Sequence, residues 1–471
     1  MSGWLSDIIN KIKNLSKSVD QYKEDTVIQS LPSFAHVNKA KKLIEKGELE
    51  KAKQTLIKAL EFPNKDALVY KYLGIIYDRE KKHDKAVAAY QISADWNPQD
   101  KTIWQKLGFA LIATGKFEAA EKSFDNANRI SAGNSDTFTG WGMALMKQKK
   151  YDEAREKFAA AAKINRYNFG AVFLHAVMDI KLMDYDKAEM KLSFLANVCP
   201  NETNTYEFAH LKLLKGEKDG AIHYALKSLD YNSEMLPTYL LLSKVYALDF
   251  DMNKALSYYE IAENKDLIAP SLYLEWAFTL VKFARYTEAK EKLSKVLELD
   301  NENREALIYL ALCNSCLGLK DEAENVLISL SDEELKNRYI KLTVGILSYL
   351  KSDYNKSLSI LKELTDDETY DSLNYYYMAK CYEALNNDTK VKDCYETAIL
   401  KNPKYLIAFI DYSKFLINKG DFLEAQRKLR KALKASSDNI EILNLLFNVN
   451  YTLVKENVCE YNIKETIAQK I

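Results

Sequence analysis

Residues 101–134 have the sequence KTIWQKLGFALIATGKFEAAEKSFDNANRISAGN, and this stretch decides the fold. Trp104 and Leu107 share one face of a predicted first helix, and Phe124 lies on a second helix that follows a turn at Gly115. The small residues of the two helices recur every 34 residues, at Gly74, Gly108 and Gly142 and at Ala86, Ala120 and Ala154. A fixed period of this length predicts an array of stacked helix pairs.

Twelve units follow this phase between residues 33 and 439. Each unit is too small to bury its own apolar face, so successive units must stack on one another. Small residues at the eighth and twentieth positions let the two helices approach, and large residues fill the remaining space. We therefore expect an all-α solenoid of about twelve helix pairs over residues 33–439. An amphipathic or capping helix is expected in residues 1–32, and two capping helices in residues 440–471.

The pattern resembles the tetratricopeptide repeat family. One unit carries the resemblance through Trp104, Leu107, Gly108, Ala120, Phe124 and Ala127, and another through Tyr70, Leu73, Gly74, Tyr77, Ala86, Tyr90 and Pro98. The resemblance covers nearly all of the chain and implies a right-handed superhelix. It also implies that five positions of each first helix, the second, fifth, ninth, twelfth and thirteenth, line the concave surface.

The residues carried over to that concave surface are apolar in its middle part, which includes two methionines. They are Lys71, Arg79, Phe109, Ile112, Met143, Met146, Lys147, Phe173, Val177, Lys181, Tyr206, His210, Lys244 and Phe278. Methionine is adaptable and suits surfaces that accept varied apolar ligands. The resemblance therefore predicts a scaffold or adaptor that binds a peptide or helical segment of a partner protein. The alternative is that these side chains only pack between neighbouring first helices.

One variant of such a groove is not expected. Family members that clamp a C-terminal carboxylate carry lysine, asparagine and arginine at set positions. Lys71 matches this pattern, but Ile75 stands in place of the asparagine and Gly140 in place of the arginine.

Residues 4–22 form a predicted amphipathic helix whose apolar stripe runs from Trp4 through Ile8, Ile12 and Val19. This helix could cover the open end of the first repeat. It could instead lie in a membrane interface or dock on a partner, because lysines lie off the stripe. Both interpretations stay open, and the second makes a peripheral membrane assembly factor an alternative function.

The remaining composition argues against several other classes of protein. The net charge is zero and no basic cluster indicates nucleic-acid binding. No secretory signal is evident and the six cysteines show no disulfide pattern, so we expect a cytoplasmic protein. No catalytic motif, metal-ligand spacing or cofactor-binding motif is present, so no enzyme, metal or cofactor is predicted. A recognition arm for an enzyme on a separate chain remains a further alternative, and the oligomeric state stays open.

Overall fold

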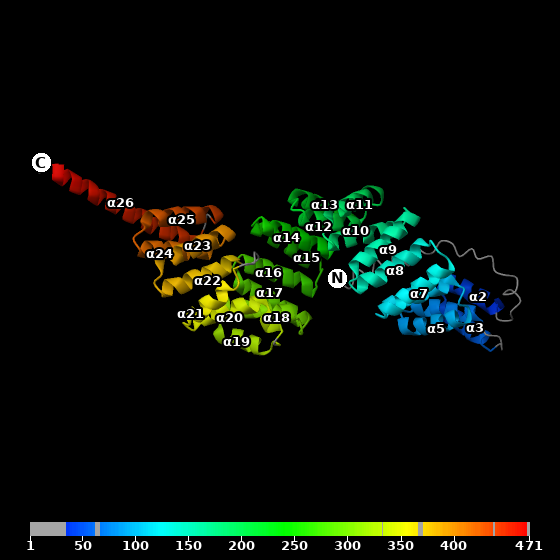
Figure 1. Ribbon diagram of the computed structural model, residues 1–471. Coiled ribbons are helices and arrows are strands. Elements are labelled where there is room, and N and C mark those ends of the chain that lie inside the picture. The colour runs from blue at the N-terminus through cyan, green and yellow to red at the C-terminus, as the bar shows by residue number, and fades with distance from the viewer. Residues whose placement is uncertain (1–33, 62–65, 332, 366–370, 437–438, 469–471) are drawn as a thin grey trace. The chain divides into compact units, whose positions relative to one another are not determined.

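The computed structural model describes residues 34–61, 66–331, 333–365, 371–436 and 439–468, and helices are the regular secondary structure in all of these ranges (Figure 1). Two compact units divide the chain, unit 1 over Met1–Ser233 and unit 2 over Glu234–Ile471. The sequence analysis did not foresee this division. The helix predicted in residues 1–32 lies outside the described residues.

In the described residues twelve helix–turn–helix pairs follow one another, six in each unit, which confirms the predicted all-α solenoid. The first helices are α2 (Phe34–Glu45), α4 (Ala67–Arg79), α6 (Lys101–Ala113), α8 (Ser135–Lys147), α10 (Phe169–Lys181), α12 (Glu202–Leu214), α14 (Leu236–Leu248), α16 (Pro270–Lys282), α18 (Arg304–Cys316), α20 (Arg338–Leu350), α22 (Asp371–Ala384) and α24 (Leu406–Asn418). The second helices are α3 (Leu49–Ala59), α5 (His83–Trp96), α7 (Phe117–Ile130), α9 (Tyr151–Ile164), α11 (Tyr185–Val198), α13 (Lys218–Tyr231), α15 (Met252–Asn264), α17 (Tyr286–Leu299), α19 (Lys320–Ile328), α21 (Tyr354–Lys362), α23 (Asp388–Lys401) and α25 (Phe422–Ala435).

The small residues at the eighth position bring the two helices of a pair together. A Cβ atom added to Gly108 on α6 would lie 2.6 Å from Cζ of Phe124 on α7. The same addition at Gly74 would lie 2.5 Å from a ring atom of Tyr90. Because these distances are far below van der Waals contact, the aromatic ring at position twenty-four takes the space that a side chain would need.

Every pair turns through one residue in the left-handed region, at the fifteenth position of the repeat. These residues are Gly47, Lys81, Gly115, Lys149, Met183, Gly216, Phe250, Ala284, Gly318, Ser352, Asn386 and Gly420. In the third pair, the N–H of Lys116 donates to the carbonyl of Leu111 at 2.9 Å, and the other turns repeat this bond. The geometry is that of a Schellman motif, which satisfies the last carbonyls of the first helix.

The first helices form the more tightly packed layer of the array. Most consecutive first helices, such as α6 and α8 or α18 and α20, contact each other more closely than consecutive second helices do in the described residues. The layer on the inside of a curved stack has the shorter path, so this difference supports placing the first helices on the concave side.

Two pairs in unit 2 depart from the regular pattern. Their second helices, α19 and α21, have nine residues each, whereas most second helices have 13 or 14. A short 3₁₀ helix, η2 (Glu334–Lys336), occupies part of the connection from α19 to α20. In the sequence, these irregular pairs lie between two groups of connecting segments that contact each other in the fold. One group is the α14–α15 and α16–α17 turns, and the other is the connection from α23 to α24.

Those turns are joined by three contacts, which we call the clasp. Lys404 Nζ donates to the carbonyl of Phe250, and Asn402 Nδ2 donates to the carbonyl of Lys282 at 3.0 Å. The hydroxyls of Tyr286 and Tyr405 lie 3.5 Å apart and are buried. The clasp therefore links the seventh and eighth pairs to the junction between the eleventh and twelfth.

The C-terminal segment differs from its prediction. The sequence predicts two capping helices in residues 440–471, but a single helix, α26 (Ile440–Ala468), runs for 29 residues. The sequence has no glycine or proline over this range, so it contains no strong helix-ending residue. In the part of the chain that the structure describes, no helix is both long enough and apolar enough to span a bilayer.

Candidate peptide-binding surface

The structure separates the predicted groove residues by exposure. Arg79, Lys181 and Lys244 are exposed, whereas Phe109, Met146, Lys147, Tyr206, His210 and Phe278 are half-buried. The other five, Lys71, Ile112, Met143, Phe173 and Val177, are buried. Direct peptide contact was expected of all fourteen, and these five side chains have little surface exposed for it.

Lys71 is buried because its ammonium group joins two consecutive pairs. Its Nζ donates to Asp100 Oδ2 at 3.0 Å and to Thr102 Oγ1 at 2.6 Å. Burial opposes ionisation of Asp100, but the charge of Lys71 and the hydrogen bonds from Lys71 and Thr102 outweigh it and lower the pKa of that carboxyl. Gln105, at the same fifth position one repeat later, makes the equivalent bonds to Asn134 and Thr137. In these two pairs the fifth position thus holds the start of the next first helix instead of a ligand.

The four buried apolar residues belong to a continuous core. Ile112, Met143, Phe173 and Val177 lie in one cluster that runs from α5 to α12. They occupy the fifth, ninth and twelfth positions of their repeats and are buried because neighbouring first helices pack on one another there. The alternative that these side chains pack between first helices therefore holds for these four.

Cations at the thirteenth position behave in two ways. Arg79 donates to the carbonyl of Ile44, and Lys282 donates to the carbonyl of Ala247 at 2.8 Å. Each thereby caps the C-terminal end of the preceding first helix, where positive charge is favourable. Lys147 and Lys181 occupy the same position in the fourth and fifth pairs, but they make no hydrogen bond or ion pair within the described ranges.

The first helices of unit 1 also carry half-buried aromatic side chains. Phe109 packs edge-on against Phe124 with ring centroids 5.2 Å apart. Tyr206 stacks on His210 at 6.4 Å, and His210 Nδ1 lies 3.2 Å from Glu207 Oε1. These contacts hold the rings in place while leaving them half-exposed.

In unit 2, the two predicted residues have different surroundings. Phe278 lies 4.1 Å from Tyr309, measured between ring centroids, and Tyr309 lies 4.8 Å from Tyr339. A row of aromatic rings thus crosses three consecutive first helices. The side chain of Lys244 is exposed on α14.

Sequence reasoning missed a recurring aromatic–lysine pair. Lys157 lies 3.6 Å above the Trp141 ring, and Lys292 lies 3.3 Å above the Trp276 ring. Lys428 covers Tyr412 at 5.4 Å. In all three pairs the aromatic residue is at position seven and the lysine at position twenty-three, so a spacing of 16 residues was the available signal. These lysines stabilise the pairs through cation–π contact.

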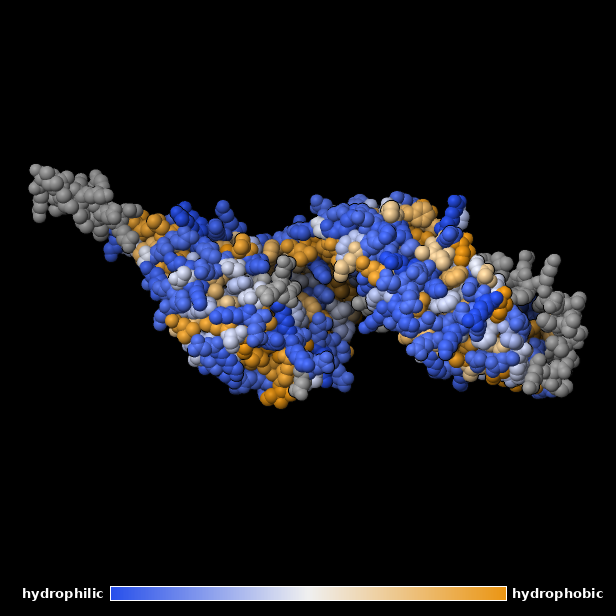
Figure 2. Space-filling view, in the orientation of Figure 1, coloured by the Kyte–Doolittle hydropathy of each residue, from blue (hydrophilic) through white to orange (hydrophobic). Residues whose placement is uncertain are grey.

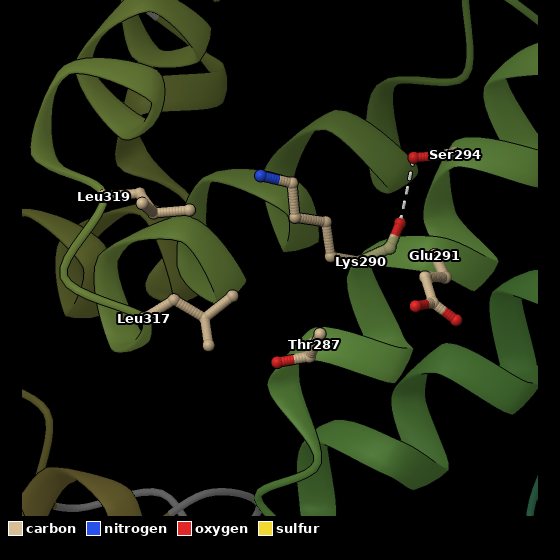
Figure 3. Close-up of a pocket in the computed structure, with 6 residues that line it drawn as sticks. All are labelled: Thr287, Lys290, Glu291, Ser294, Leu317 and Leu319. Carbon is tan, nitrogen blue, oxygen red and sulfur yellow. Dashed lines mark hydrogen bonds between the residues drawn. The ribbon is translucent and has the colours of Figure 1, made fainter.

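A hollow of about 510 Å³ lies between α17 and the turn before α19 (Figure 3). Thr287, Lys290, Glu291 and Ser294 come from α17, and Leu317 and Leu319 come from the turn. Lys290 is paired with Glu322, and the Ser294 hydroxyl donates to the Lys290 carbonyl at 3.0 Å. The lining is therefore mixed in polarity and its lysine is already neutralised.

A second hollow of about 350 Å³ lies beside the clasp. Its wall includes Tyr286, Cys316, Tyr376, Tyr377 and Tyr405. Burial raises the pKa of the Cys316 thiol to about 12, so the reactive thiolate is scarce at neutral pH. Neither hollow contains an arrangement of nucleophile and base. Across the described ranges, no group of three or more potential metal ligands occurs.

Comparisons with known proteins agree with the repeat pattern. The family model described as "Tetratricopeptide repeat" matches residues 102–134. The TPR repeat-containing protein YpiA of Bacillus subtilis (strain 168) is 22% identical over 238 residues, which are 50% of this chain and 55% of that protein. The aligned stretch thus spans only about half of the relative's length.

Solved structures of helical repeat proteins are also similar. A tetratricopeptide repeat protein from Parabacteroides merdae has a TM-score of 0.42 and 19% identity, over 49% of this chain and 92% of that one. The APC/C hetero-tetramer Cut9–Hcn1 has a TM-score of 0.40 and 13% identity, over 87% and 95%. The matched repeat, the 34-residue period and the described helix pairs together show that the chain carries tetratricopeptide repeats.

Proposed function

We propose that unit 1 binds a peptide segment of another protein along its layer of first helices. Proteins of this fold serve in general as interaction scaffolds, but the fold alone names no ligand. The observation that carries the proposal is the pairing of half-exposed rings with unpartnered cations on the same layer. Phe109, Tyr206 and His210 supply the rings, and Lys147 and Lys181 supply the cations.

The chemistry of this layer defines the ligand. Rigid, half-exposed aromatic rings bury apolar side chains at little entropic cost. Lysines without a carboxylate partner favour an acidic ligand and fix its direction. The expected ligand is an extended or helical segment that alternates apolar and acidic residues. Met146 and Phe109 replace Met143 and Phe173 as the apolar contacts, because the latter two are buried in the core.

A site-specific crosslinking experiment tests this proposal. The photoreactive residue p-benzoylphenylalanine replaces Tyr206 in the full chain, and crosslinking is carried out in native lysate. We expect a defined partner peptide, identified by mass spectrometry, and its loss in a Lys147→Glu, Lys181→Glu variant. Lys163→Glu, which reverses an exposed charge on the second helix α9, is the matched control and retains the crosslink.

A second crosslinking position tests the choice of layer. Tyr231 is exposed at the end of the second helix α13. The proposal is wrong if Tyr231 captures the same partner as well as Tyr206 does, or if reversing both lysines leaves the Tyr206 crosslink unchanged. Intact helicity of each variant is checked by circular dichroism.

The other functions considered from the sequence remain predictions. A membrane tether in residues 4–22 falls outside the described residues, and flotation with liposomes before and after removal of residues 1–30 tests it. The recognition-arm alternative predicts that an enzyme on a separate chain copurifies with the protein. A cytoplasmic location likewise stays a prediction.

A further inference from the structure

Helix α26 has one buried face and one open face. Ile442 and Val449 are fully buried against the preceding pair. On the opposite side, five large apolar side chains are 42–73% exposed: Ile440, Leu443, Phe447, Tyr451 and Val454. Figure 2 shows hydrophobic residues gathered on the described part of this helix, where it leaves α25. Neighbours at spacings of three and four lie on one side of a helix, so the five form a single stripe.

The open face of α26 corresponds to the face through which other first helices pack against the second helix of the same pair. In α6, Gly108 at the eighth position receives the Phe124 ring of α7. In α26, the residue at the eighth position is Phe447. A second helix cannot approach there as closely as α7 approaches α6, because the large ring takes its place. Within the described residues α26 also runs straight on to Ala468, so no second helix returns to cover the stripe.

The stripe is symmetric about Phe447. Ile440 and Val454 lie seven residues before and after it, and Leu443 and Tyr451 lie four before and after. Asn444 and Asn450 lie three before and after, at the edges of the stripe. A sequence with this property matches itself when two copies run antiparallel, because each apolar position then meets an apolar position. A closed two-fold interface requires this self-complementarity.

From this symmetry we propose that two copies of the chain associate through α26, antiparallel, with Phe447 of both copies on the two-fold axis. Phe447 then packs on its own counterpart, and Ile440 of one copy lies opposite Val454 of the other. The proposal does not depend on the peptide-binding surface of unit 1.

Charge placement agrees with this pairing. No residue of the stripe is charged, so no ion loses its hydration at the centre of the interface. Glu441 and Lys455 lie on one edge of the helix, six residues before and eight after Phe447. In the antiparallel pair, Glu441 of each copy falls beside Lys455 of the other. Glu441 already lies 2.7 Å from Lys414, so it contributes to a small surface network and not to an isolated pair.

The area of the stripe is enough for a weak, specific dimer. Five large side chains at this exposure cover on the order of 500 Å² per chain, or about 1,000 Å² for both copies. That is close to the lower limit for a specific interface. We therefore expect a dimer that dissociates on dilution.

Analytical ultracentrifugation of the full chain over about 1–100 µM tests the proposal. We expect a monomer–dimer equilibrium for the natural sequence and a monomer for Phe447→Glu. Because Phe447 is exposed, this substitution leaves the fold intact. Met190→Glu is the matched control, since Met190 is a similarly exposed apolar residue on α11, and it leaves the dimer in place.

A charge-swap experiment tests the position of the axis. Phe447→Glu and Phe447→Lys each place like charges opposite one another and remain monomeric alone. Mixed together, they restore a dimer that contains one chain of each kind. A natural chain that is monomeric at about 100 µM, or a dimer that survives Phe447→Glu, overturns the proposal. A mixture that stays monomeric overturns the placement of Phe447 on the axis.

Discussion

Met183 occupies the turn after α10 with a φ of 60°, and its side chain is 76% exposed. The left-handed conformation is unfavourable for a residue with a Cβ atom, and the exposed side chain gains little from packing. We expect Met183→Gly to raise the free energy of unfolding by about 0.5–1 kcal/mol, after the larger entropy of glycine in the unfolded chain is subtracted.

Urea unfolding followed by circular dichroism measures this change. Gly115→Ala, at the same repeat position with a φ of 77°, is the opposite substitution and is expected to destabilise. Equal midpoints for all three proteins would show that the turn conformation does not limit stability.

Gly108 offers a second test at the level of one residue. A Cβ atom there would lie 2.6 Å from the Phe124 ring, so Gly108→Ala is expected to lower the free energy of unfolding by about 1–3 kcal/mol. Phe124→Leu in the same chain removes the ring and should recover part of the loss. If the two substitutions are simply additive in urea unfolding, the two residues are not coupled as described.

Much of this detail was predictable from the sequence, because each repeat contacts mainly its neighbours. The glycines and alanines at positions eight and twenty identified the close approach of each pair. The burial of Met143 and Phe173 was not predictable in the same way. Phe173 at position five and Met143 at position nine face either the next first helix or a ligand, depending on how tightly neighbouring pairs pack. A single sequence does not encode that distance in any one residue.

Between α10 and α11, the imidazole of His175 lies beside a buried carboxylate and couples the pair to pH. Asp179 is fully buried, and Lys191 Nζ donates to its Oδ2 at 2.6 Å. His175 Nε2 lies 4.0 Å from its Oδ1. Burial and the charge of Lys191 lower the pKa of His175 to about 4, although Asp179 acts in the opposite direction.

The sign of the resulting pH dependence follows from that pKa. A histidine in the unfolded chain titrates near 6.5, so below this pH the unfolded chain binds a proton that the folded imidazole does not take up. The free energy of unfolding should therefore fall by about 2 kcal/mol between pH 7 and pH 5 from this group. His175→Gln should remove that part of the fall.

Urea midpoints at pH 7 and pH 5 check this expectation. The control is His223→Gln, which removes an exposed imidazole on α13. If His175→Gln and the control keep the same pH dependence as the natural chain, the lowered pKa of the half-buried His175 has no thermodynamic consequence.

At the scale of unit 2, the clasp stabilises the fold through contacts between helix pairs that are far apart in the sequence. Asn402→Ala with Lys404→Ala removes the two hydrogen bonds to the carbonyls of Lys282 and Phe250. The expected loss is about 1–3 kcal/mol. Hydrogen exchange should accelerate at the amides of the α14–α15 and α16–α17 turns and stay unchanged throughout unit 1. Lys434→Ala, at an exposed position of α25, is the control.

The clasp lies beyond what the repeat pattern predicts. The 34-residue period identifies which helices are neighbours along the chain. Whether Asn402 reaches Lys282 depends on the small rotation of each helix pair relative to the one before it, added up over all the intervening pairs. The period likewise did not indicate that α19 and α21 are shorter than the other second helices.

A stack whose members touch only their neighbours stretches under tension like a coil spring, because each junction yields a little. Unit 2 adds a tie between residues that are 154 positions apart in the chain. A force applied across that tie must first break its bonds before the coil between them can extend. We therefore expect unit 1 to be compliant and unit 2 to resist extension up to a threshold, so that a single chain combines an elastic half with a stiff half.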